Sequence, residues 1–181
     1  MNPLGWLAQG AMPEFAKQWA LAQLFAAAAA AFGSDVPQLR GLSSSERLQR
    51  FAGFTRDHVE ELLRDRADLE AVQTQLYRSS WILGRRCGRL VGVRGMEDTM
   101  AIGRLLYRIL DIEFHGDSEG EVRISRCHFS HFYSPEVCQV MSAMDWGILA
   151  GLSNGGELLF TSRITAGQTC CRARFTLQPH L

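Results

Sequence analysis

The stretch CQVMSAMDWGILAG, residues 138–151, predicts a helix that is apolar on almost every side. It carries one carboxylate, Asp145, in its middle. A charged carboxylate placed in apolar surroundings costs several kcal/mol unless a partner satisfies it. Asp145 is therefore either neutralised by a partner or retained because the protein uses it. The segments on either side of this helix indicate the fold.

Two pairs of short strands flank the helix. LDIEFHG and GEVRISRCHF surround a turn at residues 117–120, and ELLFTSRI and TCCRARFTL surround a turn at residues 165–168. Short alternating runs separated by Gly, Asp and Ser predict β-hairpins. Ser134 and Pro135 supply a helix cap and a first-turn proline, and SNGG ends the helix. The order is hairpin, helix, hairpin.

The first half of the chain reads as helical. One helix is predicted over residues 13–32, and a second follows a cap within residues 43–46. A third covers about residues 69–89, and a fourth begins at Glu97 and continues to about Tyr107. The prediction is a single α+β domain, residues 1–181, with N-terminal helices packed on a small antiparallel sheet of two hairpins separated by a helix. Its parts are an Ala-rich helix (1–35), a helical half (36–110) and a hairpin–helix–hairpin half (111–178).

Composition narrows the function. The chain has 181 residues and a formal net charge of zero at pH 7. Composition therefore predicts neither a nucleic acid nor an anionic membrane as a partner held by overall charge. Five cysteines make an odd count without a secretory signal, which favours free thiols in the cytoplasm. The stretch WALAQLFAAAAAAFG is Ala-rich and broken by Gln23, which predicts a packing helix and a homodimer contact in preference to a membrane segment.

Common catalytic signatures are missing from the chain, including Gly-x-Ser-x-Gly, His-Glu-x-x-His and paired Cys-x-x-Cys. The stretch WILGRRCGRLVGVRG is rich in glycine and arginine but lacks a phosphate-loop pattern. Its glycines predict close packing between helices.

Three side chains on the predicted helix 138–151 could act together. Cys138, Ser142 and Asp145 are spaced so that they fall on one helix face. The carboxylate could serve as a general base or bind a substrate cation, and the thiol could attack an electrophilic carbon. In the structural alternative Cys138 is a small core residue, Ser142 is filler, and Asp145 meets an arginine or backbone amides.

A metal site is the weaker interpretation of the nearby histidines. The stretch RCHFSHFY contains Cys127, His128 and His131, and either Cys170 or Cys171 could join them from a neighbouring strand. Structural zinc sites normally show two well-separated ligand pairs, so we predict no metal and keep zinc as a minor alternative. The other interpretation is a histidine pair that lines a pocket or lies on the surface.

The final third has a recognisable layout. It combines Asp145-Trp146, Ser153-Asn154 and LLFTSRITAGQTCCRARF, in which Gly167 precedes Cys170 and Cys171. This layout resembles the L-2-amino-thiazoline-4-carboxylic acid hydrolase family over residues 75–177. It is also similar to 4-vinyl reductase-type small-molecule-binding domains. Relatives often place a cysteine two or three residues before the aspartate, whereas this chain has Ser142-Ala143 there and its cysteine earlier, at Cys138.

The resemblance implies an enzyme that acts on a small cyclic, amidine-like substrate containing nitrogen and sulfur, without a cofactor. Its catalytic residues would be Asp145, Cys138 and Cys171. Residues that would bind the substrate are His128, His131, Trp146, Ser142, Arg163 and Cys170. An arginine such as Arg163, Arg126 or Arg172 could hold a substrate carboxylate.

The alternative that the resemblance implies is a non-catalytic module that binds or senses an apolar small molecule or a tetrapyrrole. Its walls would be aromatic. They would comprise Trp146, Phe129, Phe132 and Phe160.

Overall fold

The computed structural model describes residues 12–178, so residues 1–11 of the predicted Ala-rich segment lie outside the described residues. The described part contains five α-helices, four strands and two short 3-10 turns. These are α2 (Glu14–Phe32), α3 (Ser44–Arg64), α4 (Leu69–Val91), α5 (Met96–Ile109), β1 (Ile112–Gly116), β2 (Glu121–Cys127), η1 (His128–His131), α6 (Pro135–Leu152), β3 (Glu157–Ser162), η2 (Ile164–Ala166) and β4 (Cys171–Thr176).

Local signals in the sequence explain where α2 ends and where α3 begins. Gly33 closes α2 in the left-handed conformation and donates its N–H to the Ala29 carbonyl. Ser43 caps α3 with a capping box, in which its side chain and that of Glu46 each bind the other's backbone N–H. Both ends lie where the sequence predicts them.

Helix α6 forms the centre of the molecule. The Ser134 hydroxyl accepts a hydrogen bond from the Val137 N–H at 3.2 Å, and Pro135 opens the first turn. Most of its side chains are buried, in keeping with a sequence that is apolar all round.

Glycines allow α4 and α6 to pack closely, as the sequence predicts. A methyl group added to Gly84 would overlap the Ile148 carbonyl oxygen, and one added to Gly147 would overlap that of Tyr77. Backbone therefore meets backbone along this interface, which fixes α6 firmly against α4. The glycines that make these contacts are Gly84, Gly88, Gly147 and Gly151.

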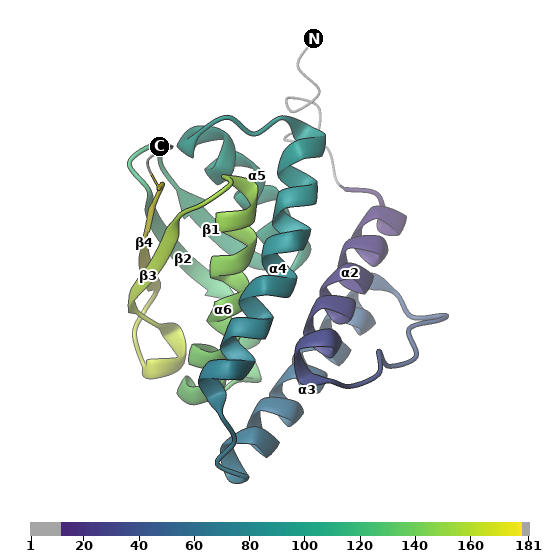
Figure 1. The fold of residues 1–181 in the computed structure, drawn as a ribbon. Helices are drawn as coiled ribbons and strands as arrows, with labels where there is room; N and C mark the ends of the chain where they lie inside the picture. Colours follow the sequence, from purple (N-terminus) through teal and green to yellow (C-terminus); the bar gives the residue numbers. More distant parts are fainter. Residues whose placement is uncertain (1–11, 179–181) are drawn as a thin grey trace.

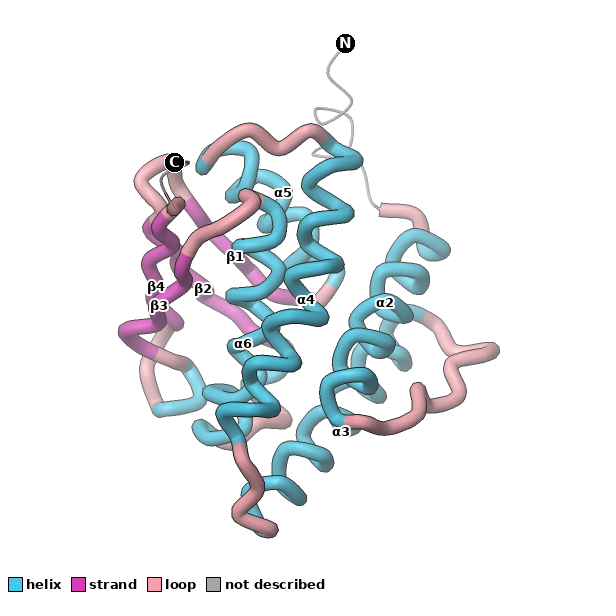
Figure 2. Tube along the Cα trace, viewed as in Figure 1, coloured by secondary structure: helices cyan, strands magenta, loops and turns pink. Residues whose placement is uncertain are grey.

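The four strands form one antiparallel sheet in the order β1-β2-β4-β3. Its two hairpins join side by side through β2 and β4, where Ile124 lies opposite Cys171. Side chains alternate along β4 between buried and exposed, so one face of the sheet points into the core. Figure 2 shows the strands gathered at one side of the molecule, with the helices beside them. The predicted α+β class is confirmed.

The helices lie on one side of the sheet (Figure 1). Helices α5 and α6 contact strands, α4 packs on α6, and α2 packs on α4 and α3. Phe25 of α2 is fully buried, and its ring meets the edge of Phe51 of α3 at 5.1 Å. Phe15 and Trp19 of α2 remain exposed. None of the helices within residues 12–178 combines the length and the apolar character needed to cross a bilayer.

Candidate functional site

A cavity of about 80 Å³ lies between the inner face of the sheet and helices α2, α3, α5 and α6. We call it the sheet-side cavity. Its walls are mainly apolar, and half of its polar and sulfur-containing residues come from α6 and the segment after β3. Small-molecule sites commonly combine apolar walls with a few polar groups that fix the ligand's orientation. The polar and sulfur-containing residues that line it are Tyr107, Cys127, Tyr133, Cys138, Ser142, Asp145, Arg163 and Cys171.

Asp145 is held by one side-chain hydrogen bond. Its Oδ1 accepts the hydroxyl of Tyr107 at 2.7 Å, and Tyr107 is itself only 3% exposed and stacked on Phe114 at 4.6 Å. Within residues 12–178 no donor lies within hydrogen-bonding distance of Oδ2. This oxygen is nevertheless not completely enclosed by the protein. Asp145 is half-buried and lines the cavity.

Burial raises the pKa of Asp145 to about 6, although the Tyr107 hydrogen bond and the positive charge of Arg163 both act to lower it. The carboxyl group is therefore mostly ionised at pH 7 and becomes protonated under mildly acidic conditions. A group with this pKa can accept a proton or hold a cation.

Arg163 joins the other polar groups of the cavity. Its guanidinium donates to the Ser142 hydroxyl at 3.0 Å and to the Cys138 sulfur at 3.8 Å, and it lies 4.2 Å above the Phe160 ring. Within the described residues no carboxylate forms an ion pair with it. Cys138, Ser142 and Asp145 therefore share one face of α6, as the sequence predicts, and Arg163 can still bind an anion.

Two further thiols lie in the wall. The Cys171 sulfur accepts the Ile164 N–H at 3.4 Å, and burial raises the pKa of this thiol. Burial raises the pKa of Cys127 to about 12. Both thiols are protonated at neutral pH, which disfavours either one as a nucleophile.

Other residues named from the sequence lie elsewhere. The indole N–H of Trp146 donates to the Gly156 carbonyl at 2.8 Å, and its ring packs on Tyr77, outside the lining of the sheet-side cavity. Cys170 is buried just before β4 but does not line the cavity either. The arginine candidates Arg126 and Arg172 are exposed, and Arg126 pairs with Asp111.

The two histidines also lie outside the cavity lining. His128 packs against Phe132, burial lowers its pKa, and its Nε2 is enclosed without a hydrogen-bond partner among the described residues. His131 is exposed. No three His, Cys, Asp or Glu side chains come together as a metal site anywhere in residues 12–178.

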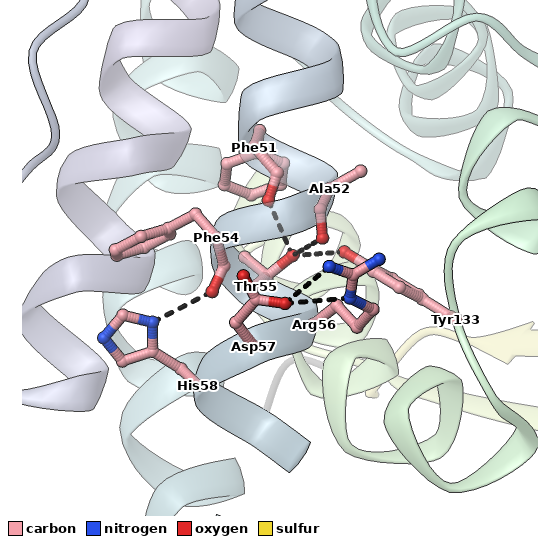
Figure 3. A network of polar contacts seen from close by, with 8 residues as sticks. All are labelled: Phe51, Ala52, Phe54, Thr55, Arg56, Asp57, His58 and Tyr133. Carbon is pink, nitrogen blue, oxygen red and sulfur yellow. Dashed lines mark hydrogen bonds and ion pairs between the residues drawn. The ribbon is translucent and has the colours of Figure 1, made fainter. Parts of the chain in front are cut away.

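Sequence reasoning missed two tyrosines. Tyr107 orients Asp145, and Tyr133 reaches from the segment before α6 to Thr55 on α3, as Figure 3 shows. Thr55 donates to the Phe51 carbonyl at 2.8 Å, so its oxygen is left to accept the Tyr133 hydroxyl. Neither pairing leaves a local signal, because Tyr107 and Asp145 are 38 residues apart and Thr55 and Tyr133 are 78 apart.

Comparison with known proteins supports the fold. No protein-family model and no curated protein matches the chain. Among solved structures, it is similar to a trafficking protein particle complex subunit 3 from Naegleria fowleri that is covalently bound to palmitic acid. The two share 18% identity with a TM-score of 0.56, over 74% of this chain and 96% of that one. At this identity the likeness shows a shared fold.

Proposed function

We propose that the protein binds a small organic molecule in the sheet-side cavity, with a hydrogen-bond donor or cation on Asp145 Oδ2. The observation that carries this proposal is the Asp145 carboxylate, which has one oxygen held by Tyr107 and, among residues 12–178, no donor on the other. A carboxylate oxygen among mainly apolar walls without a protein donor is unfavourable in the empty protein. A ligand that supplies the donor removes that penalty.

Arg163 supplies the second polar anchor in this proposal. It keeps donors free while it bridges Ser142 and Cys138, so it suits a carboxylate or another anionic group on the same ligand. The remaining walls suit an apolar body between the two ends. A ligand that carries a donor and an anionic group on an apolar frame meets all three requirements.

The comparison adds support for an apolar ligand. The Naegleria fowleri protein carries palmitic acid, so a fold of this kind can hold an apolar molecule. The volume of about 80 Å³ favours a ligand much smaller than a tetrapyrrole.

The test is calorimetric titration with 2-aminothiazoline, a small cyclic amidine that is cationic near neutral pH. We expect the wild-type protein to bind it and Asp145→Asn to lose at least about tenfold in affinity, because a charge-assisted hydrogen bond is lost. The control is Asp57→Asn, since Asp57 is exposed on α3 and does not line the cavity. Equal affinity in wild-type protein and Asp145→Asn would overturn the proposal.

A second candidate is the hydrolase that the sequence resemblance implies. Cys138 favours it, because this half-buried thiol lines the same cavity as Asp145 and accepts a hydrogen bond from Arg163. Asp145 would activate water and Arg163 would hold the substrate carboxylate. Incubation with L-2-amino-thiazoline-4-carboxylic acid, followed by chromatography, tests this: substrate loss that Asp145→Asn abolishes supports it, and binding without turnover rejects it.

A cytoplasmic location and a homodimer belong to the same proposal. All five cysteines are free, which suits a reducing compartment. The exposed Phe15 and Trp19 of α2 suit a contact between copies. Light scattering on Phe15→Ser/Trp19→Ser tests the dimer, and an unchanged mass would place the contact elsewhere or exclude it.

A further inference from the structure

A second and larger cavity borders Asp145 from the other side. It measures about 260 Å³ and lies among α2, α4, α5 and α6, away from the sheet. We call it the helix-side cavity. Its walls are almost wholly apolar, and exposed Trp19 and Leu90 line it, so it approaches the surface between α2 and α4.

The two cavities share part of their walls. Tyr107 and Asp145 line both, so the hydrogen-bonded pair stands between them. The remaining shared residues are apolar side chains without any competing polar group: Leu24, Leu110 and Ile148. Asp145 is thus adjacent to apolar space on the helix side as well as on the sheet side.

The volumes indicate how the two cavities relate. Organic-ligand pockets usually measure about 300–1,000 Å³. The sheet-side cavity alone falls well short of this range, whereas the two together reach its lower end. Besides the shared pair, the part of the helix-side cavity lining within residues 12–178 includes the polar side chains of Gln23, which is half-buried, and Arg86, which is exposed.

We propose that the two cavities are halves of one ligand site, and that the ligand is an elongated amphipathic molecule whose donor group binds Asp145 and whose apolar tail occupies the helix-side cavity. This inference rests on the proposed function, because it uses the same donor on Asp145. It adds the substrate class: a hydroxyl-, amide- or amine-bearing molecule with a linear hydrocarbon tail.

Chain length is the property to measure. Primary alcohols from butanol to dodecanol carry one donor and an uncharged tail of increasing length. Their affinities are measured by the loss of Nile red fluorescence as each alcohol displaces the bound dye. Each added methylene buried in apolar space should improve affinity roughly fourfold until the cavity is full. We expect this increase in the wild-type protein.

Variants that fill the helix-side cavity locate the tail. Cys87 on α4 and Leu106 on α5 are half-buried. Both line the helix-side cavity, and neither lines the sheet-side cavity. In Cys87→Phe and in Leu106→Phe, decanol affinity should fall at least about tenfold more than butanol affinity. The matched control is Ile82→Phe, because Ile82 is exposed on α4 and lines neither cavity. It should keep the wild-type series.

The possible results separate the two proposals. An unchanged chain-length series in both filled variants, confirmed as folded by circular dichroism, overturns the joint site and leaves binding at Asp145 intact. A flattened series in either folded variant with a normal series in Ile82→Phe supports the joint site. If Asp145→Asn binds 2-aminothiazoline as the wild type does, the underlying function itself is wrong.

Discussion

Two tyrosine hydroxyls bound the sheet-side cavity, and their surroundings differ. Tyr133 meets Thr55, whose hydroxyl in turn meets the Phe51 carbonyl, so every polar group of this set has a partner (Figure 3). Tyr107 meets Asp145, whose second oxygen has no protein donor within residues 12–178. Burial raises the pKa of both tyrosines. The hydroxyls are alike, and the difference lies in their partners.

The comparison separates a structural pair from a pair available to a ligand. A satisfied buried network stabilises a fold and leaves nothing for a ligand to complete. A partly satisfied one destabilises the empty protein and gains from a ligand. The Thr55–Tyr133 pair should therefore report on stability alone, while the Tyr107–Asp145 pair should report on stability, pH and binding together.

The largest effect should come from Asp145→Asn. The folded pKa of about 6 exceeds the ordinary value of 3.8, so folding takes up a proton between these values and stability falls as pH rises through about 6. Removing the charge should raise the free energy of unfolding by at most about 3 kcal/mol at pH 8 and by about half as much at pH 5, where the carboxyl group is ionised in the unfolded chain but mostly protonated in the folded one. Urea unfolding at both pH values measures this, with Asp57→Asn as control. An equal change at both would contradict the account.

Tyr107→Phe should act in the opposite direction. It removes the Tyr107 hydroxyl that donates to the carboxylate, and a hydrogen bond to a charged group contributes about 2 kcal/mol. We expect that loss at pH 8, a smaller loss at pH 5, and a higher pKa for Asp145, because the Tyr107 hydrogen bond lowers it. Unfolding curves combined with an NMR titration check all three. A pKa that stays the same or falls would show that Tyr107 does not support the charge.

Thr55→Val should break the Thr55–Tyr133 pair and lower the free energy of unfolding by the same amount at every pH tested. Thr55 is fully buried, and its loss leaves the Tyr133 hydroxyl without its partner, at a cost of about 1–2 kcal/mol. Neither hydroxyl titrates between pH 5 and pH 8, so the loss should be the same at both. The exposed Thr176→Val is the matched control. A loss that varies with pH would mean that this pair is coupled to Asp145.

Tyr133→Phe should give the smallest change. Thr55 keeps its bond to the Phe51 carbonyl, so no buried group is orphaned and the loss should stay below about 1 kcal/mol. Thermal unfolding of Tyr133→Phe and Thr55→Val under the same conditions shows which variant loses more stability. A larger loss for Tyr133→Phe than for Thr55→Val would reverse the roles assigned to the pair.

The sequence predicts the architecture well because its signals are local. Gly33, the Ser43 capping box and Ser134-Pro135 each act within one helical turn: Gly33 ends α2, and the other two begin α3 and α6 where expected. The row of Cys138, Ser142 and Asp145 also follows from spacing within one helix. These features need no knowledge of the rest of the chain.

The site is less predictable because its partners are distant in sequence. Tyr107 and Arg163 reach α6 from other elements, and only the folded chain shows which side chains meet there. Trp146 adjoins Asp145 in sequence, yet the helix turns it towards Tyr77 and Gly156. Successive side chains on a helix point in different directions. Trp146 therefore lies outside the lining of the sheet-side cavity although it follows Asp145 in the sequence.

The pKa of the Asp145 carboxyl group tests the central claim most directly. Carbon-13 NMR of the side-chain carboxyl, assigned with Asp145→Asn, should give a pKa near 6 in the free protein. The pKa should fall when saturating 2-aminothiazoline places a cation on Oδ2. A value at or below 3.8 in the free protein, unchanged by the probe, would mean that protein donors already satisfy both oxygens and would contradict the account.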